Sequence, residues 1–239
     1  FFRALAGAII LNPNDPNVAI VELVANKLGR LADKVVLVGG CATGLLITDT
    51  ARPPVRATQD VDLIVEITTH DNYRTFTKEL KRVGFKEDCE VICRWRIDNL
   101  KVDIMPTDDS ILGFSNRWYP DAIVYAQRIT MPSGYKINLI SSPLFIATKL
   151  EAFYGRGNHD YGRSHDIEDI VNVIDGRSEL LNEIKEAKEE IRIYLAEEID
   201  DLLASADFVD KLSWHLHGDQ ESQSRVSYIV SQLRSIAGL

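Results

Sequence analysis

The stretch VLVGGCATGLLITDTARPPVRATQDVDLIVEI, residues 36–67, decides the fold. An apolar run ends at Gly39 and Gly40, and a second segment rich in alanine and leucine follows directly. This order predicts a short buried strand over residues 35–38, a glycine turn, and then a helix. A loop with two prolines leads to another apolar run, residues 61–67, which predicts the next strand.

Two aspartates interrupt the start of that second strand. Because side chains alternate along a strand, Asp60 and Asp62 are expected on one face of it. Neighbouring carboxylates repel each other unless a cation lies between them, and Mg²⁺ binds carboxylate oxygens. Asp103, in the run LKVDIMP, is a third carboxylate within an expected strand. If the two strands are adjacent, three carboxylates meet, and metal ions there would activate an attacking oxygen and stabilise a leaving pyrophosphate.

The glycine pair comes directly after a strand and opens a helix. Because glycine has no side chain, the backbone N–H groups of Gly39 and Gly40 are accessible, and N–H groups at the start of a helix attract anions. We therefore expect this turn to bind the phosphates of a nucleotide. A glycine pair alone is weak evidence, but with Asp60, Asp62 and Asp103 it forms a fairly specific pattern.

The periodicity of apolar residues predicts an α+β fold in two lobes. Residues 1–142 indicate a small mixed β-sheet with flanking helices, and residues 143–239 indicate an all-helical C-terminal lobe. Strands are expected over residues 35–38, 61–67, 91–97, 100–105, 122–130 and 135–140. Helices are expected over residues 18–31, 41–47, 70–83, 144–154, 165–175, 178–204 and 220–236.

Charge is distributed unevenly along the chain. The net charge is -9, and the acidic excess lies after residue 145, where 10 basic residues accompany 19 acidic ones. This argues against a general nucleic-acid binder but leaves room for a local basic cleft. Three cysteines with no matching motif predict neither a disulfide framework nor a zinc site. No uncharged apolar run is long enough to cross a bilayer, so we expect a cytoplasmic protein.

The order of these motifs resembles the DNA polymerase beta-like nucleotidyltransferase superfamily. Gly39, Gly40, Asp60, Asp62 and Asp103 fall on the places of the family pattern. The resemblance implies that the first lobe is a nucleotidyltransferase lobe in which Asp60 and Asp62 bind the metals. It implies that Asp103 is the third ligand or the base for the incoming hydroxyl. The 19 residues between Gly40 and Asp60 exceed the superfamily's commonest spacing.

Within the superfamily, GGCATGLL, RATQDVDL, KLEAFYGRG and SHDIEDI are similar to AbiEii-type toxins of bacterial abortive-infection and toxin–antitoxin systems. The resemblance covers residues 35–174. It implies a basic pair that reaches toward the triphosphate, phosphate contacts beside the metal strand, and an acidic motif in the helical lobe. The basic pair is Lys149 and Arg156. The phosphate contacts are Arg56 and Thr58, with Arg163 as a weaker candidate, and the acidic motif contains Asp166 and Asp169. From the residues alone, the basic pair also fits a solvated helix face, and the acids fit a helix N-terminus.

The leading hypothesis is metal-dependent transfer of a nucleoside monophosphate from an NTP to an acceptor hydroxyl, with Mg²⁺ or Mn²⁺ as cofactor. The AbiEii resemblance implies a toxin whose acceptor is an RNA or tRNA 3′ end or a protein, and an antitoxin as partner. The acidic C-terminal lobe keeps a second hypothesis open, in which a cationic small molecule such as an aminoglycoside is the acceptor. A third hypothesis is a catalytically silent nucleotide-binding module.

Overall fold

The computed structural model describes residues 15–156 and 159–239, so the first 14 residues of the predicted N-terminal lobe lie outside it. It confirms the α+β fold, with one seven-stranded mixed sheet and many helices. The described chain forms two compact units. Unit 1 comprises residues 15–48, Pro54–Ser115 and Tyr119–Ile140, and unit 2 comprises Asp49–Pro53, Asn116–Trp118 and Ser141–Leu239.

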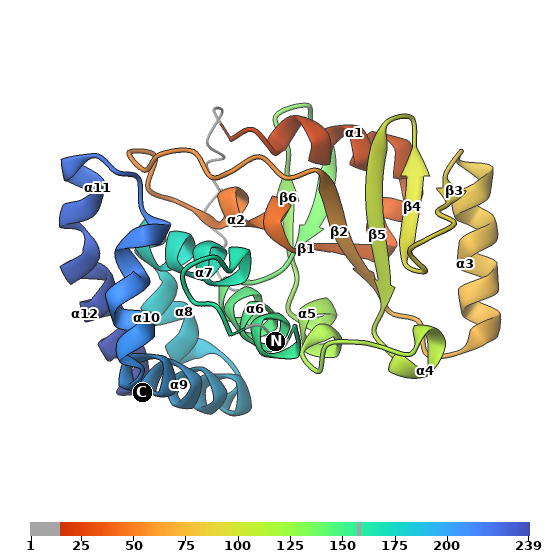
Figure 1. Cartoon of the computed structure of the whole chain (residues 1–239). Coiled ribbons are helices and arrows are strands. Elements are labelled where there is room, and N and C mark those ends of the chain that lie inside the picture. The colour runs from red at the N-terminus through yellow and green to blue at the C-terminus, as the bar shows by residue number, and fades with distance from the viewer. Residues whose placement is uncertain (1–14, 157–158) are drawn as a thin grey trace. The chain divides into compact units, whose positions relative to one another are not determined.

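Unit 1 is built on the sheet (Figure 1). Its strands are β1 (Val35–Val38), β2 (Asp60–Val65), β3 (Lys86–Glu87), β4 (Arg94–Ile97), β5 (Leu100–Pro106), β6 (Gln127–Thr130) and β7 (Lys136–Leu139). Their order across the sheet is β3-β4-β5-β2-β1-β7-β6. β2 pairs antiparallel with β1 and parallel with β5, and β5 pairs antiparallel with β4. The two strands that carry the predicted carboxylates are therefore neighbours.

One face of the sheet is covered by α1. The helices of unit 1 are α1 (Val18–Leu28), a 3-10 helix (Gly29–Lys34), α2 (Gly40–Leu46), α3 (His70–Arg82), α4 (Asp109–Leu112) and α5 (Tyr119–Val124). Val21 and Val24, three residues apart on α1, are buried and share a small apolar cavity with Leu63 of β2. Because side chains alternate along β2, Asp60 and Asp62 point to the opposite face of the sheet.

Unit 2 consists mainly of helices packed on one another. They are α6 (Ser142–Gly155), α7 (His165–Gly176), α8 (Leu180–Glu186), α9 (Glu189–Ala204), α10 (Ala206–Lys211), a 3-10 helix (Leu212–His215), α11 (Gln220–Ser224) and α12 (Val226–Ala237). α6 packs on α7 and α9, and α12 packs on α9 and α7. Phe145, Ile167, Leu195 and Leu233 are fully buried, one from each of these helices. This apolar core holds the helical unit together.

A short segment of the loop before β2 belongs to the helical unit. The backbone N–H of Asp49 donates to the carbonyl of Gly176 at 3.0 Å. The Arg52 guanidinium is nearly buried and lies 3.6 Å from Asp175 and 3.5 Å from Glu221. These contacts join residues far apart in the sequence, and they explain why Asp49–Pro53 groups with unit 2 although it precedes residue 142.

Some predicted elements are wrong in detail. The strand expected over residues 91–97 begins only at Arg94. The strand expected over residues 122–130 begins only at Gln127, and the residues before it form α5, whose first turn contains Pro120, a residue favoured there. The helix expected over residues 178–204 is divided at Ala187, where the backbone is extended with ψ 162°. The helix expected over residues 220–236 is divided at Arg225 into α11 and α12. Three short elements, β3, α4 and α10, were not predicted from the sequence.

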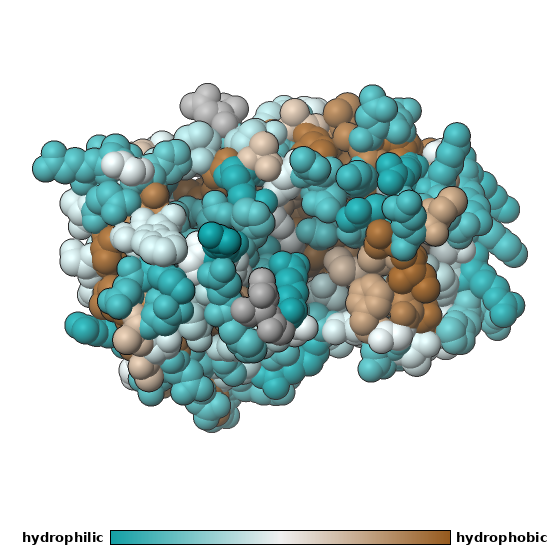
Figure 2. All heavy atoms as spheres, in the orientation of Figure 1, coloured by the Kyte–Doolittle hydropathy of each residue, from teal (hydrophilic) through white to brown (hydrophobic). Residues whose placement is uncertain are grey.

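The face of the molecule seen in Figure 2 is mainly hydrophilic, with hydrophobic residues exposed in separate groups. Among residues 15–156 and 159–239, none of the helices has both the length and the apolar character that crossing a membrane requires. In the same ranges, Cys41, Cys89 and Cys93 are free thiols.

Candidate active site

The turn between β1 and α2 requires a glycine. Gly39 has φ 66° and ψ -162°, a conformation that side-chain-bearing residues rarely adopt. A Cβ atom at Gly39 would lie 1.9 Å from Oδ2 of Asp62. The carboxylate of Asp62 therefore lies directly against the backbone of the turn, and Gly40 opens α2 as the sequence indicates.

The three predicted carboxylates share one face of the sheet. β2 and β5 are parallel, and Asp62 is the register partner of Asp103. Register partners in adjacent strands point the same way, and Asp60 points the same way as Asp62 because they are two residues apart. Asp60 and Asp62 are half-buried, whereas Asp103 is buried. The sheet thus brings together carboxylates from two strands that are separated in sequence by about 40 residues.

Arg94 of β4 binds two of these carboxylates and was missed by the sequence analysis. Its Nε donates to Asp103 Oδ1 at 2.7 Å, and its Nη2 donates to Asp103 Oδ2 at 2.7 Å and to Asp60 Oδ2 at 3.1 Å. The hydrogen bonds to Asp103 are the main reason that the pKa of Arg94 is raised, so the guanidinium is always charged. A signal was present in the sequence: a hairpin closed at Asp98 and Asn99 places Arg94 opposite Asp103.

The donor set suits a hard divalent cation, although the site is not closed around one. Within the described ranges, 15–156 and 159–239, no three acidic, histidine or cysteine side chains are grouped closely enough to hold one ion. The guanidinium of Arg94 lies between Asp60 and Asp103 and supplies the positive charge that pairs with both carboxylates. Carboxylate oxygens are the ligands that Mg²⁺ and Mn²⁺ prefer, and the Asp60 side chain is 38% exposed, so it is accessible to an ion.

A polar network fixes the end of the loop that leads into β2. Asn17 is buried; its Oδ1 accepts hydrogen bonds from the backbone N–H of Thr58 at 2.9 Å and from the Thr58 hydroxyl at 3.3 Å. Its Nδ2 donates to the carbonyl of Arg56 at 3.0 Å. Arg56 and Thr58, predicted beside phosphate, thus lie in a segment that Asn17 anchors just before Asp60. The side chain of Arg56 is half-buried.

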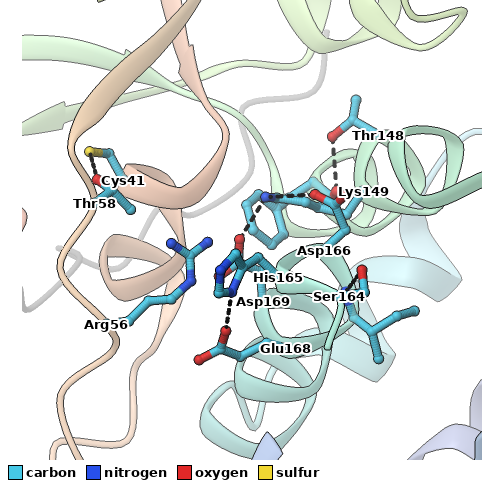
Figure 3. A network of polar contacts seen from close by, with 12 residues as sticks. Cys41, Arg56, Thr58, Thr148, Lys149, Ser164, His165, Asp166, Glu168 and Asp169 are labelled. Atoms are coloured by element: carbon cyan, nitrogen blue, oxygen red, sulfur yellow. Dashed lines mark hydrogen bonds and ion pairs between the residues drawn. The ribbon is translucent and has the colours of Figure 1, made fainter. Parts of the chain in front are cut away.

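Cys41 lies at the start of α2, beside the same loop. Its Sγ is 2.8 Å from the Thr58 hydroxyl (Figure 3). The thiol also donates to the carbonyl of Asp60 at 3.3 Å. Burial raises the pKa of Cys41 to about 12, and the nearby carboxylate of Asp62 adds to the rise. The thiol is therefore protonated near neutral pH and is not an activated nucleophile.

The predicted residues of the helical unit form a cluster of ion pairs within that unit (Figure 3). The Nζ of Lys149, on α6, lies 2.6 Å from Asp169 Oδ2 and 3.2 Å from Asp166 Oδ1, both on α7. Arg156 Nη1 lies 2.6 Å from Asp166 Oδ2, although the Arg156 side chain is 66% exposed. Ser164 caps α7 by accepting from the N–H of Ile167, so the two aspartates do not serve as the cap. Both aspartates pair with the buried ammonium group of Lys149.

Comparisons with known proteins identify no family. No protein-family model matches the chain, and no curated protein matches it. Among solved structures, JHP933 from Helicobacter pylori is similar with a TM-score of 0.48 and 13% identity, over 93% of this chain and 92% of that chain. ANT(2")-Ia in complex with adenylyl-2"-tobramycin is similar with a TM-score of 0.41 and 15% identity, over 77% of this chain and 98% of that chain. Similarities at this level do not establish the function of this chain.

Proposed function

We propose that the chain is a metal-dependent nucleotidyltransferase that moves a nucleoside monophosphate from an NTP to an acceptor hydroxyl. One observation carries the proposal: Asp60, Asp62 and Asp103 share one face of two adjacent strands, with Asp62 against the Gly39 turn. Carboxylates suited to divalent cations therefore lie beside the glycine turn that the sequence predicts to contact phosphate. This combination supports chemistry on a metal-bound triphosphate.

In the proposed reaction, the acceptor oxygen forms a bond to the α-phosphorus of the NTP. The bond from that phosphorus to its bridging oxygen breaks, and pyrophosphate leaves with the electron pair. Asp60 and Asp62 would hold the divalent ions, and Asp103 would be a third ligand or the base that takes the proton of the attacking hydroxyl. Bound Mg²⁺ or Mn²⁺ would offset the negative charge of the attacking and leaving oxygens. The further predicted nucleotide contacts are Gly39, Gly40, Arg56, Thr58, Lys149, Arg156 and Asp166.

We further propose that the acceptor is an RNA or tRNA 3′ end or a protein hydroxyl, and that the chain is the toxin of a toxin–antitoxin or abortive-infection system. The AbiEii-like motifs between residues 35 and 174 support this role. Induced expression in bacteria then arrests growth, whereas expression of a variant without Asp60 and Asp62 does not. Growth arrest by that variant would contradict a toxic role for nucleotidyl transfer.

The test is label transfer from each α-labelled NTP, with Mg²⁺ or Mn²⁺, to total RNA and to a protein lysate. We expect a labelled acceptor with the wild-type chain and none with the Asp60→Asn, Asp62→Asn double variant. Asp98→Asn is the matched control, because Asp98 lies in the exposed β4–β5 turn at φ 51°, a conformation that asparagine also adopts. Equal labelling by the wild-type chain and the double variant would refute the proposed role of the carboxylates.

One observation favours a second acceptor class. Residues 146–239, most of unit 2, hold the whole excess of negative charge, 10 basic residues against 19 acidic ones. Such a surface attracts a cationic small molecule and repels RNA. In this alternative, a strain that expresses the chain resists an aminoglycoside-like antibiotic and grows normally. Nucleotide binding without transfer to any of these acceptors would instead indicate a catalytically silent module.

A further inference from the structure

Arg94 occupies an unusual place among the candidate site residues. It is the register partner of Asp103 across β4 and β5, and it binds that carboxylate through two nitrogens at 2.7 Å each. The same Nη2 also donates to Asp60 at 3.1 Å. Only 19% of the Arg94 side chain is exposed. The guanidinium is thus an internal cation between two of the carboxylates expected to bind metal.

The two contacts of Arg94 are unequal. The paired bonds to Asp103 match the fork of a guanidinium to both oxygens of a carboxylate, a strong and oriented arrangement. The bond to Asp60 is single and longer, and the Asp60 side chain is 38% exposed against 12% for Asp103. A charge-assisted hydrogen bond to a more exposed carboxylate is the weaker of the two. Of the two carboxylates, Asp60 is therefore the one that an incoming cation displaces from Arg94 with less cost.

We propose that Arg94 is the resident counter-ion of this site, which keeps hold of Asp103 while a divalent cation takes Asp60 from it. The proposal rests on the proposed function, because it concerns the same carboxylates. Arg94 neutralises the carboxylates before a metal arrives, and it fixes the Asp103 side chain in one orientation. It is a positioning residue, since it acts through Asp103 and Asp60.

This exchange has a measurable consequence for metal affinity. A divalent ion that binds the wild-type chain must break the Arg94–Asp60 hydrogen bond and share the site with a nearby positive charge. Both effects weaken metal binding when no nucleotide is present. Removal of the charge at position 94 therefore tightens metal binding, by about tenfold if one charge-assisted hydrogen bond no longer competes.

The experiment measures Mn²⁺ binding to the full chain by calorimetry and by electron paramagnetic resonance, at pH 8 and without nucleotide. We expect Arg94→Gln to bind Mn²⁺ about tenfold more tightly than the wild-type chain. Arg94→Lys keeps the positive charge but loses the fork of the guanidinium, so it is expected to tighten Mn²⁺ binding less than Arg94→Gln does. Arg96→Gln is the matched control, because Arg96 lies on the same strand but pairs with Asp88 and is exposed.

The outcomes separate this inference from the proposed function. Equal or weaker Mn²⁺ binding by Arg94→Gln, with binding intact in the wild-type chain, overturns the counter-ion role and leaves the metal site standing. Equal tightening in Arg96→Gln also overturns it, because the effect would then come from net charge alone. No Mn²⁺ binding by any of these proteins refutes the metal site and the counter-ion role together. A thermal melt of each variant shows that affinities are compared between folded proteins.

Discussion

The two carboxylate clusters of this chain differ in burial. In unit 1, Asp60 and Asp103 share the guanidinium of Arg94, and Asp60 remains partly open to solvent. In unit 2, Asp166 and Asp169 are almost fully buried, and Lys149, itself buried, binds both of them. The clusters contain the same kinds of groups, carboxylates and a basic side chain, but they lie on strands in one case and on helices in the other.

The difference in burial predicts different roles for the two clusters. A charge buried in a protein is strongly destabilising unless a partner compensates it, so the unit 2 cluster is expected to be held by its own pairing. A partly exposed carboxylate is solvated by water, so losing its ion-pair partner costs little free energy. Such a carboxylate can exchange its partner for a ligand. We therefore expect substitution of the partly exposed carboxylates of unit 1 to affect activity first, and substitution of the buried charges of unit 2 to affect folding first. The predictions below test this contrast.

The largest expected effect is on activity, in unit 1. Asp62→Asn should lower the rate of nucleotide transfer on the order of 10³-fold, because a neutral amide cannot replace a metal-binding carboxylate. The same substitution should change the free energy of unfolding little, because asparagine has nearly the size and shape of aspartate. Steady-state kinetics and urea unfolding of one preparation measure both quantities. If the variant lost activity only in proportion to its loss of folded protein, the two units would not differ as proposed.

The next effect is on stability, in unit 2. Lys149→Met leaves Asp166 and Asp169 buried without their shared ammonium group, and we expect the free energy of unfolding to fall by about 3 to 5 kcal/mol. Lys185→Met on α8 is the matched control, because Lys185 is exposed, and we expect a change below about 0.5 kcal/mol. Urea unfolding followed by circular dichroism gives both values. Equal, small changes for the two lysines would show that the buried pairing does not stabilise unit 2.

A smaller effect is expected at the glycine turn. Gly39→Ala places a methyl group against the carboxylate of Asp62, so the carboxylate or the turn must move. Gly29→Ala separates the backbone cost from this collision, since Gly29 has φ 54° and ψ -122°, and a Cβ added there would meet no atom within 4 Å. We expect about 1 kcal/mol of destabilisation at Gly29 and about 1 to 3 kcal/mol more at Gly39. Similar values at both sites would mean that Asp62 does not press against the turn.

Much of the fold could be predicted from the sequence, because its decisive signals are local. The apolar runs and Gly39 mark β1, the turn and α2 within a few residues of one another, and alternation along β2 places Asp60 and Asp62 on one face. Arg94 was missed because its contact with Asp103 depends on the register of two strands, not on a motif. The division of the helix at Ala187 has no glycine or proline to mark it, so no local signal predicts it.

The last prediction concerns the reactivity of the cysteines of unit 1. Burial raises the pKa of Cys41 to about 12 and that of Cys93 to about 11, whereas Cys89 is exposed. A raised pKa keeps the unreactive thiol form at pH 8, so iodoacetamide should modify Cys89 at least about 100-fold faster than the other two. Mass spectrometry of the native chain over time measures the order. Rapid modification of Cys41 would show that the start of α2 opens to solvent.

The central claim is that the carboxylate face of unit 1 transfers the α-phosphoryl group of an NTP together with its nucleoside. The most direct measurement compares α-labelled and γ-labelled NTP in parallel reactions of the wild-type chain with its acceptor. We predict that the α label moves to the acceptor and that the γ label leaves as pyrophosphate, and that Asp62→Asn abolishes both. Transfer of the γ label to the acceptor would instead identify a kinase and contradict the account.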